Sequence, residues 1–250
     1  MYAQQFLRVF IGLVLMTSGV AFADDAASRA IVEKAIERLG DADRLAKFHA
    51  MTSKLKGTIQ LNGARISFTG EINLQGGTQQ RISVSLLIDS QAITFASIVN
   101  QSGGWQKIND NTIDMSPDQL ADAKESAYTA WVTTLLPLRD KAFKLAPFGE
   151  VEIDGRKVVG VNVTREGHRS LNLFFDKETY RLVRSDATVR DEMTFKDVSE
   201  ETTYGDYKAF EGIQHPTKLK IKRDGLSYAE LEVEDFKASE KIDDSTFAKP

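Results

Sequence analysis

Apolar and polar residues alternate along residues 65–74, and this alternation most constrains the fold. One side of the stretch carries Ile66, Phe68, Gly70, Ile72 and Leu74, and the other carries Arg65, Ser67, Thr69, Glu71 and Asn73. Because successive strand residues point to opposite faces, the stretch predicts a half-buried β-strand. Residues 82–88 repeat the pattern, and Gly76-Gly77 lies between the two runs. We therefore expect an antiparallel hairpin.

Short strands and turns predict that most of the chain is sheet. The run Ala92 to Val99 is apolar on both sides, which is typical of a strand covered on both faces. From Val151 onward, turn pairs recur about every ten residues, which favours a meander in an open barrel or sandwich. These pairs include Asp154-Gly155, Glu166-Gly167, Glu211-Gly212 and Asp224-Gly225.

Three stretches have helical spacing instead. Apolar residues predict an amphipathic helix over 26–39 that ends at Gly40. A short helix over 41–48 would have Asp41 as its N-cap. A longer helix over 117–138 would have Ser116 as N-cap and Pro117 at its first position.

The first 23 residues have the features of a secretory signal peptide. Arg8 precedes a short apolar run, and Ala21-Phe22-Ala23 forms a small-x-small cleavage pattern before two aspartates. The run is shorter than the roughly 20 residues of a membrane-spanning helix, so we expect cleavage after Ala23 and export to the periplasm. An uncleaved N-terminal anchor is the alternative. The chain has no cysteine, so it can form neither a disulfide nor a bacterial lipoprotein anchor.

Composition and motifs exclude several function classes. The chain has 250 residues, 42% of them hydrophobic and 27% charged, and a formal charge of −4. This composition predicts one globular domain over 24–250 and no nucleic-acid partner. Common catalytic and phosphate-binding motifs are absent, and His49, His168 and His215 lack metal-ligand spacing. We therefore expect no enzymatic activity, catalytic residues, metal or cofactor, although carboxylates from distant strands could still pair.

With these function classes excluded, a hydrophobic surface or cavity is the remaining basis for a function. A curved antiparallel sheet packed on helices leaves either a filled core or an apolar cavity, and periodicity does not distinguish the two. Ordinary core packing is the alternative for every aromatic residue. The candidates for lining a ligand cavity are Phe68, Phe95, Tyr128, Trp131, Leu135, Leu173 and Phe175.

The C-terminal half resembles the outer-membrane lipoprotein-sorting family, the LolA/LolB-like periplasmic carriers. The resemblance lies in residues 158–163 and 171–183, where a strand ending in Phe175-Asp176 turns at Thr179 into a strand with Leu182-Val183. Further similar segments are 204–207, 212–216 and the end of the chain, 242–250. These are patterns of strands and turns, so they are more specific for fold than for function.

The resemblance implies an α+β, mainly β fold. This would be an incomplete, unclosed antiparallel β-barrel wrapped around a helical plug or lid, with one N-terminal helix. It also implies a hydrophobic cavity for acyl chains of lipids or lipoproteins in transit across the periplasm. The family's lid-locking arginine matches no single residue here. Lys54, Lys56, Arg65 and Arg81 lie in the corresponding region.

Two functions follow as hypotheses. The first is a soluble periplasmic carrier of lipids or lipoproteins, without stable membrane insertion, whose helix over 117–138 is the plug or lid. An acyl chain gains roughly 0.8 kcal/mol per buried methylene, so such a site needs no precisely placed polar residue. The alternative is an envelope sensor or protein-interaction module with the same fold, a self-filled core and an envelope protein partner. An enzyme ranks third.

Overall fold

The computed structural model describes residues 18–61, 63–88, 91–191 and 194–250. Residues 1–17 of the predicted signal peptide lie outside the described residues. The helices are α1 (Ser18–Glu37), α2 (Ala42–Leu45) and α3 (Pro117–Val132), with 3-10 turns η1 (Leu136–Arg139) and η2 (Asp244–Phe247). The strands are β1 (Ala50–Leu61), β2 (Ala64–Gln75), β3 (Gln79–Ile88), β4 (Gln91–Val99), β5 (Gly104–Ile108), β6 (Asn111–Asp114), β7 (Lys144–Ile153), β8 (Arg156–Thr164), β9 (Leu171–Asp176), β10 (Leu182–Arg190), β11 (Asp197–Phe210), β12 (Ile213–Arg223) and β13 (Leu226–Ser239).

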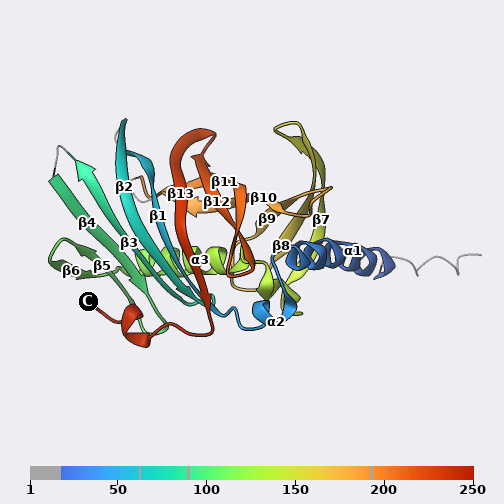
Figure 1. Ribbon diagram of the computed structural model, residues 1–250, viewed down its shortest axis with the longest axis horizontal. Coiled ribbons are helices and arrows are strands. Elements are labelled where there is room, and N and C mark those ends of the chain that lie inside the picture. Colours follow the sequence, from blue (N-terminus) through green and yellow to red (C-terminus); the bar gives the residue numbers. More distant parts are fainter. Residues whose placement is uncertain (1–17, 62, 89–90, 192–193) are drawn as a thin grey trace, which may run out of the picture.

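All thirteen described strands form one antiparallel sheet. Its order is β6-β5-β4-β3-β2-β1-β13-β12-β11-β10-β9-β8-β7, so β1 and β13 pair at the centre and β6 and β7 are the two edges. Figure 1 shows the sheet curving around α3, with α1 beside β7 and β8. This is the expected unclosed, mainly β barrel with an N-terminal helix and an internal helix.

The turn chemistry explains the meander. The pairs Asp154-Gly155, Glu211-Gly212 and Asp224-Gly225 each have positive φ at both residues. Two-residue hairpins prefer this conformation because its twist matches that of the strands. Each pair joins two neighbouring strands, as predicted. The predicted hairpin at Gly76-Gly77 is also confirmed, with Gln75 opposite Gln79.

The register divides the sheet into two faces. We call the face that carries Leu74 and Val99 the inner face, because both residues pack against Ala127 of α3. By alternation the predicted apolar side of β2 also lies on the inner face. The opposite, outer face carries the polar side of β2, including Glu71.

The helices differ from prediction at their ends. Ser116 caps α3 in a capping box with Gln119, as expected, but α3 ends at Val132 and not at 138. The chain leaves the helical path at Leu135, which is left-handed with φ 69°, and Pro137 near the start of the next turn has no N–H with which to continue the helical hydrogen bonds. A separate turn, η1, follows. Asp41 caps α2 as predicted, whereas α1 begins before the expected residue 26 and ends at Glu37.

The main core lies between the helices and the C-terminal half of the sheet. α1, η1 and the end of α3 pack there on the inner faces of β7–β13, with Ile36, Phe143 and Phe175 fully buried. A smaller cluster joins α3 to the other half of the sheet through Leu74, Val99 and Ala127. α3 therefore spans both halves.

The C-terminal tail covers part of the outer face. Phe247 of η2 is fully buried, and its carbonyl accepts a hydrogen bond of 2.8 Å from Asn100 Nδ2. The predicted two-sided cover of β4 is thus observed only in its second half. Ile98 and Val99 are buried there, whereas Ala92 is exposed.

Candidate functional site

The inner face of the N-terminal strands is apolar and incompletely covered. α3 packs only on the end of this face, at Leu74, Val99 and Gly104. Towards the other end, Phe68 is 8% exposed and its apolar neighbours are only partly buried. The partly buried set on this face is Ile66, Ile72, Ile82, Val84, Leu86, Ile93 and Phe95. These side chains form a continuous apolar surface in the concavity.

The predicted cavity residues fall into two groups. Phe68 and Phe95 lie on this apolar inner face. Tyr128, Leu135, Leu173 and Phe175 are each at most 2% exposed in the main core, and Trp131 is partly buried beside them. The missed members of the surface, such as Leu86 and Ile93, belong to the same alternating runs. The same alternation that predicts the strands indicates that these residues face inward.

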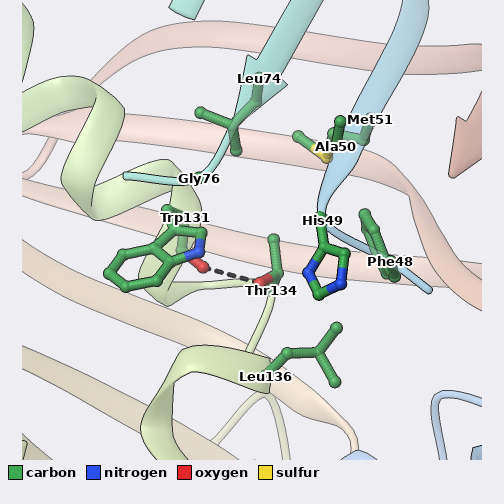
Figure 2. Close-up of a pocket in the computed structure, with 9 residues that line it drawn as sticks. All are labelled: Phe48, His49, Ala50, Met51, Leu74, Gly76, Trp131, Thr134 and Leu136. Atoms are coloured by element: carbon green, nitrogen blue, oxygen red, sulfur yellow. Dashed lines mark hydrogen bonds between the residues drawn. The ribbon is translucent and has the colours of Figure 1, made fainter. Parts of the chain in front are cut away.

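A small pocket lies beneath the end of α3, where the helix packs closely against β1 and the β2–β3 turn. Figure 2 shows its nine lining residues, which come from the start of β1 and the two residues before it, from the end of β2 and the following turn, and from the end of α3 and the residues that follow it. Its volume is about 20 Å³, enough for a single water molecule. A Cβ built on Gly77 would lie 2.6 Å from Trp131 Cε3. The turn and the helix therefore fit together because residue 77 is glycine.

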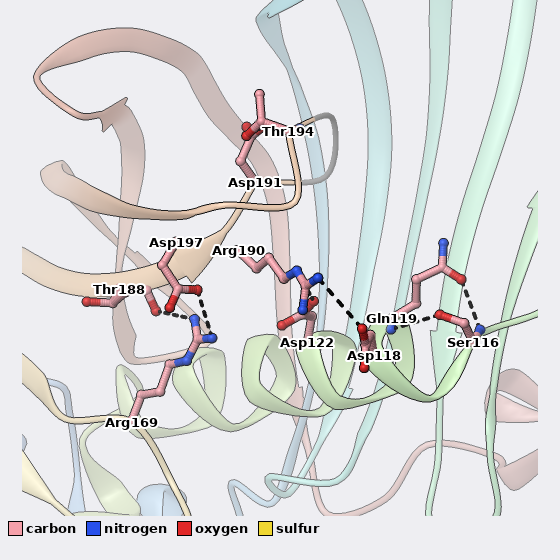
Figure 3. A network of polar contacts seen from close by, with 10 residues as sticks. All are labelled: Ser116, Asp118, Gln119, Asp122, Arg169, Thr188, Arg190, Asp191, Thr194 and Asp197. Atoms are coloured by element: carbon pink, nitrogen blue, oxygen red, sulfur yellow. Dashed lines mark hydrogen bonds and ion pairs between the residues drawn. The ribbon is translucent and has the colours of Figure 1, made fainter.

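Polar contacts hold the other side of α3 against the C-terminal half of the sheet. Figure 3 shows Arg190, at the end of β10, pointing to two carboxylates of α3. Its guanidinium lies 3.6 Å from Asp118 Oδ2 and 3.8 Å from Asp122 Oδ2. One turn further, Glu125 lies 3.0 Å from His168 Nδ1 and accepts a hydrogen bond from the Arg169 amide at 2.8 Å.

Aromatic stacking reinforces the same contact. The Tyr128 ring stacks on His168 with centroids 3.6 Å apart, and on its other side it neighbours Phe143. Burial, together with the nearby Glu125 charge, raises the pKa of Tyr128 to about 12. The phenol is therefore neutral at physiological pH and acts as a packing group.

The four basic residues in the region that corresponds to the family's lid-locking arginine lie on the outer face. Lys56 pairs with Glu234 at 2.7 Å, and Arg65 pairs with Glu230 at 2.9 Å. Arg81 donates to Ser83 Oγ and to the Thr246 carbonyl, while Lys54 is opposite Glu71. All four are separated from α3 by the sheet, whereas Arg190 approaches two carboxylates of α3 and the Arg165 guanidinium lies 5.6 Å from the centre of the Trp131 ring.

Two further observations concern the described residues. None of their helices is long and apolar enough to cross a membrane. Within the same residues, no group of three or more histidines and carboxylates is arranged to hold a metal ion.

Comparison of whole folds gives a clear result where comparison of sequences does not. At the level of sequence, no family model and no curated protein matches the chain. The crystal structure of a LolA superfamily protein from Nitrosomonas europaea matches 89% of this chain and 97% of its own, with a TM-score of 0.58 and 13% identity. This chain has the LolA-type fold.

Two other solved structures have a similar LolA-type architecture. A putative outer membrane lipoprotein-sorting protein domain from Vibrio parahaemolyticus has a TM-score of 0.53 and 13% identity, covering 87% of this chain and 97% of its own. A DUF1329 family protein from Desulfovibrio piger has a TM-score of 0.54 and 11% identity, covering 88% and 97%. The resemblance drawn from the C-terminal strands is thus confirmed at the level of fold.

Proposed function

We propose that this protein is an exported carrier that shelters acyl chains of lipids or lipoproteins against the inner face of its sheet. The partly exposed apolar surface between Ile66 and Phe95 is the single observation that carries the proposal. Contiguous exposed apolar surface is unusual in a folded protein unless something binds there. The fold of proteins described as LolA-like and lipoprotein-sorting supports the same reading.

The chemistry of such a site is simple. Each methylene removed from water contributes roughly 0.8 kcal/mol, so an apolar strand face alone binds an acyl chain. Phe68 and Phe95 would contact the cargo directly. The core residues Tyr128, Leu135, Leu173 and Phe175 would contribute only if α3 moved. The proposal assigns no catalytic residue and no cofactor.

The cellular setting is part of the proposal. Cleavage after Ala23 would release a mature domain of residues 24–250 into the periplasm, where acyl chains must be shielded from water. N-terminal sequencing of the protein from a periplasmic extract tests this cleavage, with Asp24 expected as the first residue.

Two adjacent leucines on β3 provide a matched test of acyl binding. Leu86 lies on the inner face opposite Phe68, whereas Leu87 lies on the outer face and is 59% exposed. We expect the wild type to bind a fluorescent fatty acid at micromolar concentration. Leu86→Glu should weaken binding at least about tenfold, because the acyl chain would desolvate a carboxylate. Leu87→Glu should leave binding unchanged.

Two outcomes of this titration, and one of purification from the periplasm, would reject the carrier. They are no binding by folded wild type, equal effects of the two variants, or recovery of a stoichiometric envelope protein with no lipid from the periplasm. The last outcome would favour the interaction module with a self-filled core.

A further inference from the structure

The outer face of the sheet contains a second concave feature that the carrier does not use. It is an open groove of about 620 Å³ over strands β1–β5, which we call the outer groove. The polar side chains that line it lie on the face of the sheet opposite α3, and Leu55, Gly70, Val84 and Phe95 of the same strands complete the lining. Its volume lies within the roughly 300–1,000 Å³ range of small-molecule sites.

A row of paired residues explains why the groove is there. Lys54, Glu71, Ser83, Ala96 and Lys107 lie side by side across five strands. Ser83 and Ala96 in the middle of the row have small side chains, Glu71 lies beside Lys54, and a lysine stands at each end. Strand spacing places the two lysines about 19 Å apart along the sheet. The neighbouring row adds the hydroxyls of Thr69, Ser85 and Thr94 to the floor.

In the outer groove two carboxylates have hydrogen-bond or ion-pair partners, whereas the basic side chains form no ion pair with any residue that the structure describes. Glu234 is paired with Lys56 at 2.7 Å, and Glu71 accepts a hydrogen bond of 2.8 Å from Asn73. Within the described part of the chain, Lys54 and Lys107 form no ion pair, and Arg81 donates only to Ser83 Oγ and the Thr246 carbonyl. Three cations thus face the groove without a carboxylate at ion-pair distance, and Asp110 lies at its rim.

This combination favours one class of ligand. Ammonium and guanidinium groups form their strongest hydrogen bonds with phosphate and carboxylate oxygens. Serine and threonine hydroxyls, which both donate and accept, suit the hydroxyl groups of a polar scaffold. We propose that the outer groove binds a phosphate-bearing, hydroxyl-rich molecule, either a free phosphosugar or the headgroup of an anionic lipid.

Glucose 1,6-bisphosphate is the probe for the free ligand, because it carries two phosphates and several hydroxyls. Titration at low salt, followed by amide NMR shifts, should move signals of β3, β4 and β5 around Ser83, Ala96 and Lys107. Glucose should cause no such shifts. Co-sedimentation with phosphatidylglycerol vesicles, against phosphatidylcholine vesicles, tests the headgroup source.

Variants then locate the binding. Lys54→Gln and Lys107→Gln should each weaken bisphosphate or vesicle binding about three- to tenfold, and the double variant should do so more. Lys220→Gln is the matched control, since Lys220 is on the same outer face, forms no ion pair with any described residue and lies outside the groove. Both lysines of the groove are surface residues, so these variants should remain folded.

The results that would support the outer groove differ from those that would contradict it. Binding of either phosphate source that falls with Lys54→Gln and Lys107→Gln, but not with Lys220→Gln, supports the outer groove. Absence of binding to both sources, equal effects of all three variants, or equal shifts with glucose would overturn it. Acyl binding by the inner face is measured separately through Leu86 and Leu87, so failure of one proposal leaves the other intact.

Discussion

At the scale of single residues, His215 is a partly buried base, and no charged side chain among the described residues pairs with it. Its ring stacks on Phe236 at 3.9 Å within the aromatic cluster of Phe48 and Phe210. Burial lowers the pKa of His215 to about 4, against 6.5 for the free side chain. Below pH 6.5 the unfolded chain therefore binds a proton that the folded chain excludes.

Stability should consequently fall as the pH drops from 6.5 towards 4. The histidine contribution to the free energy of unfolding is fully present above pH 6.5, and each pH unit below it costs at most about 1.4 kcal/mol. Urea unfolding at pH 7 and pH 5 should show a smaller difference for His215→Leu than for wild type. Equal differences in the two proteins would contradict the assignment.

A substitution at Phe247 tests whether the C-terminal tail contributes to the stability of the fold. Its side chain is fully buried against the outer face, although it belongs to a four-residue turn at the end of the chain. Phe247→Ala should lower the free energy of unfolding by about 3–5 kcal/mol, as for other core phenylalanines. Phe148→Ala is the control, because Phe148 is 47% exposed. If denaturant titration gives both variants the same small loss, the tail is not part of the core.

At the scale of elements, the seating of α3 depends on the β2–β3 turn. An added methyl at Gly77 would lie 2.6 Å from Trp131, so the indole and the end of α3 must shift. Gly77→Ala should destabilise the fold by about 1–3 kcal/mol, the usual cost of overpacking. Gly205→Ala, where the nearest neighbour would be 4.0 Å away, should be close to neutral. Denaturant midpoints of the two variants provide the comparison, and similar midpoints would refute the role of Gly77.

The strands, turns and helix ends differ in how far the sequence predicts them. Alternation in 65–74, the I′-type turns and the Ser116 cap are local properties, so strands, hairpins and the start of α3 followed from them. The end of α3 does not follow from the apolar spacing, because that spacing continues to Leu138 while Leu135 is left-handed and Pro137 belongs to a separate turn. The position of α3 across both halves, and the roles of Arg190 and Glu125, depend on contacts between distant segments, which periodicity does not encode.

At the scale of the whole molecule, α3 connects two halves of one sheet by different forces. Its contact with the N-terminal half is mainly apolar, through Ala127, with one hydrogen bond of 3.4 Å from Ser126 Oγ to Gln80 Oε1. Its contact with the C-terminal half combines the packing of Tyr128 with polar contacts of Glu125 and Arg190. Polar contacts that are partly exposed contribute up to about 1 kcal/mol each, so their loss should loosen α3 without unfolding the sheet.

Native-state hydrogen exchange of the double variant Glu125→Ala/Arg190→Gln tests this division. The amides of α3 should lose about tenfold in protection, since about 1.4 kcal/mol of local stability disappears, while amides paired between β1 and β13 keep theirs. Arg139→Gln is the control, because its ion pair with Glu33 at 2.9 Å joins η1 to α1. In the carrier, a looser α3 should also speed the uptake of a fluorescent fatty acid, since the helix borders the apolar face.

An equal loss of protection in β1 and α3 would mean that the two halves and the helix open as one unit, and α3 could not then move separately to admit cargo.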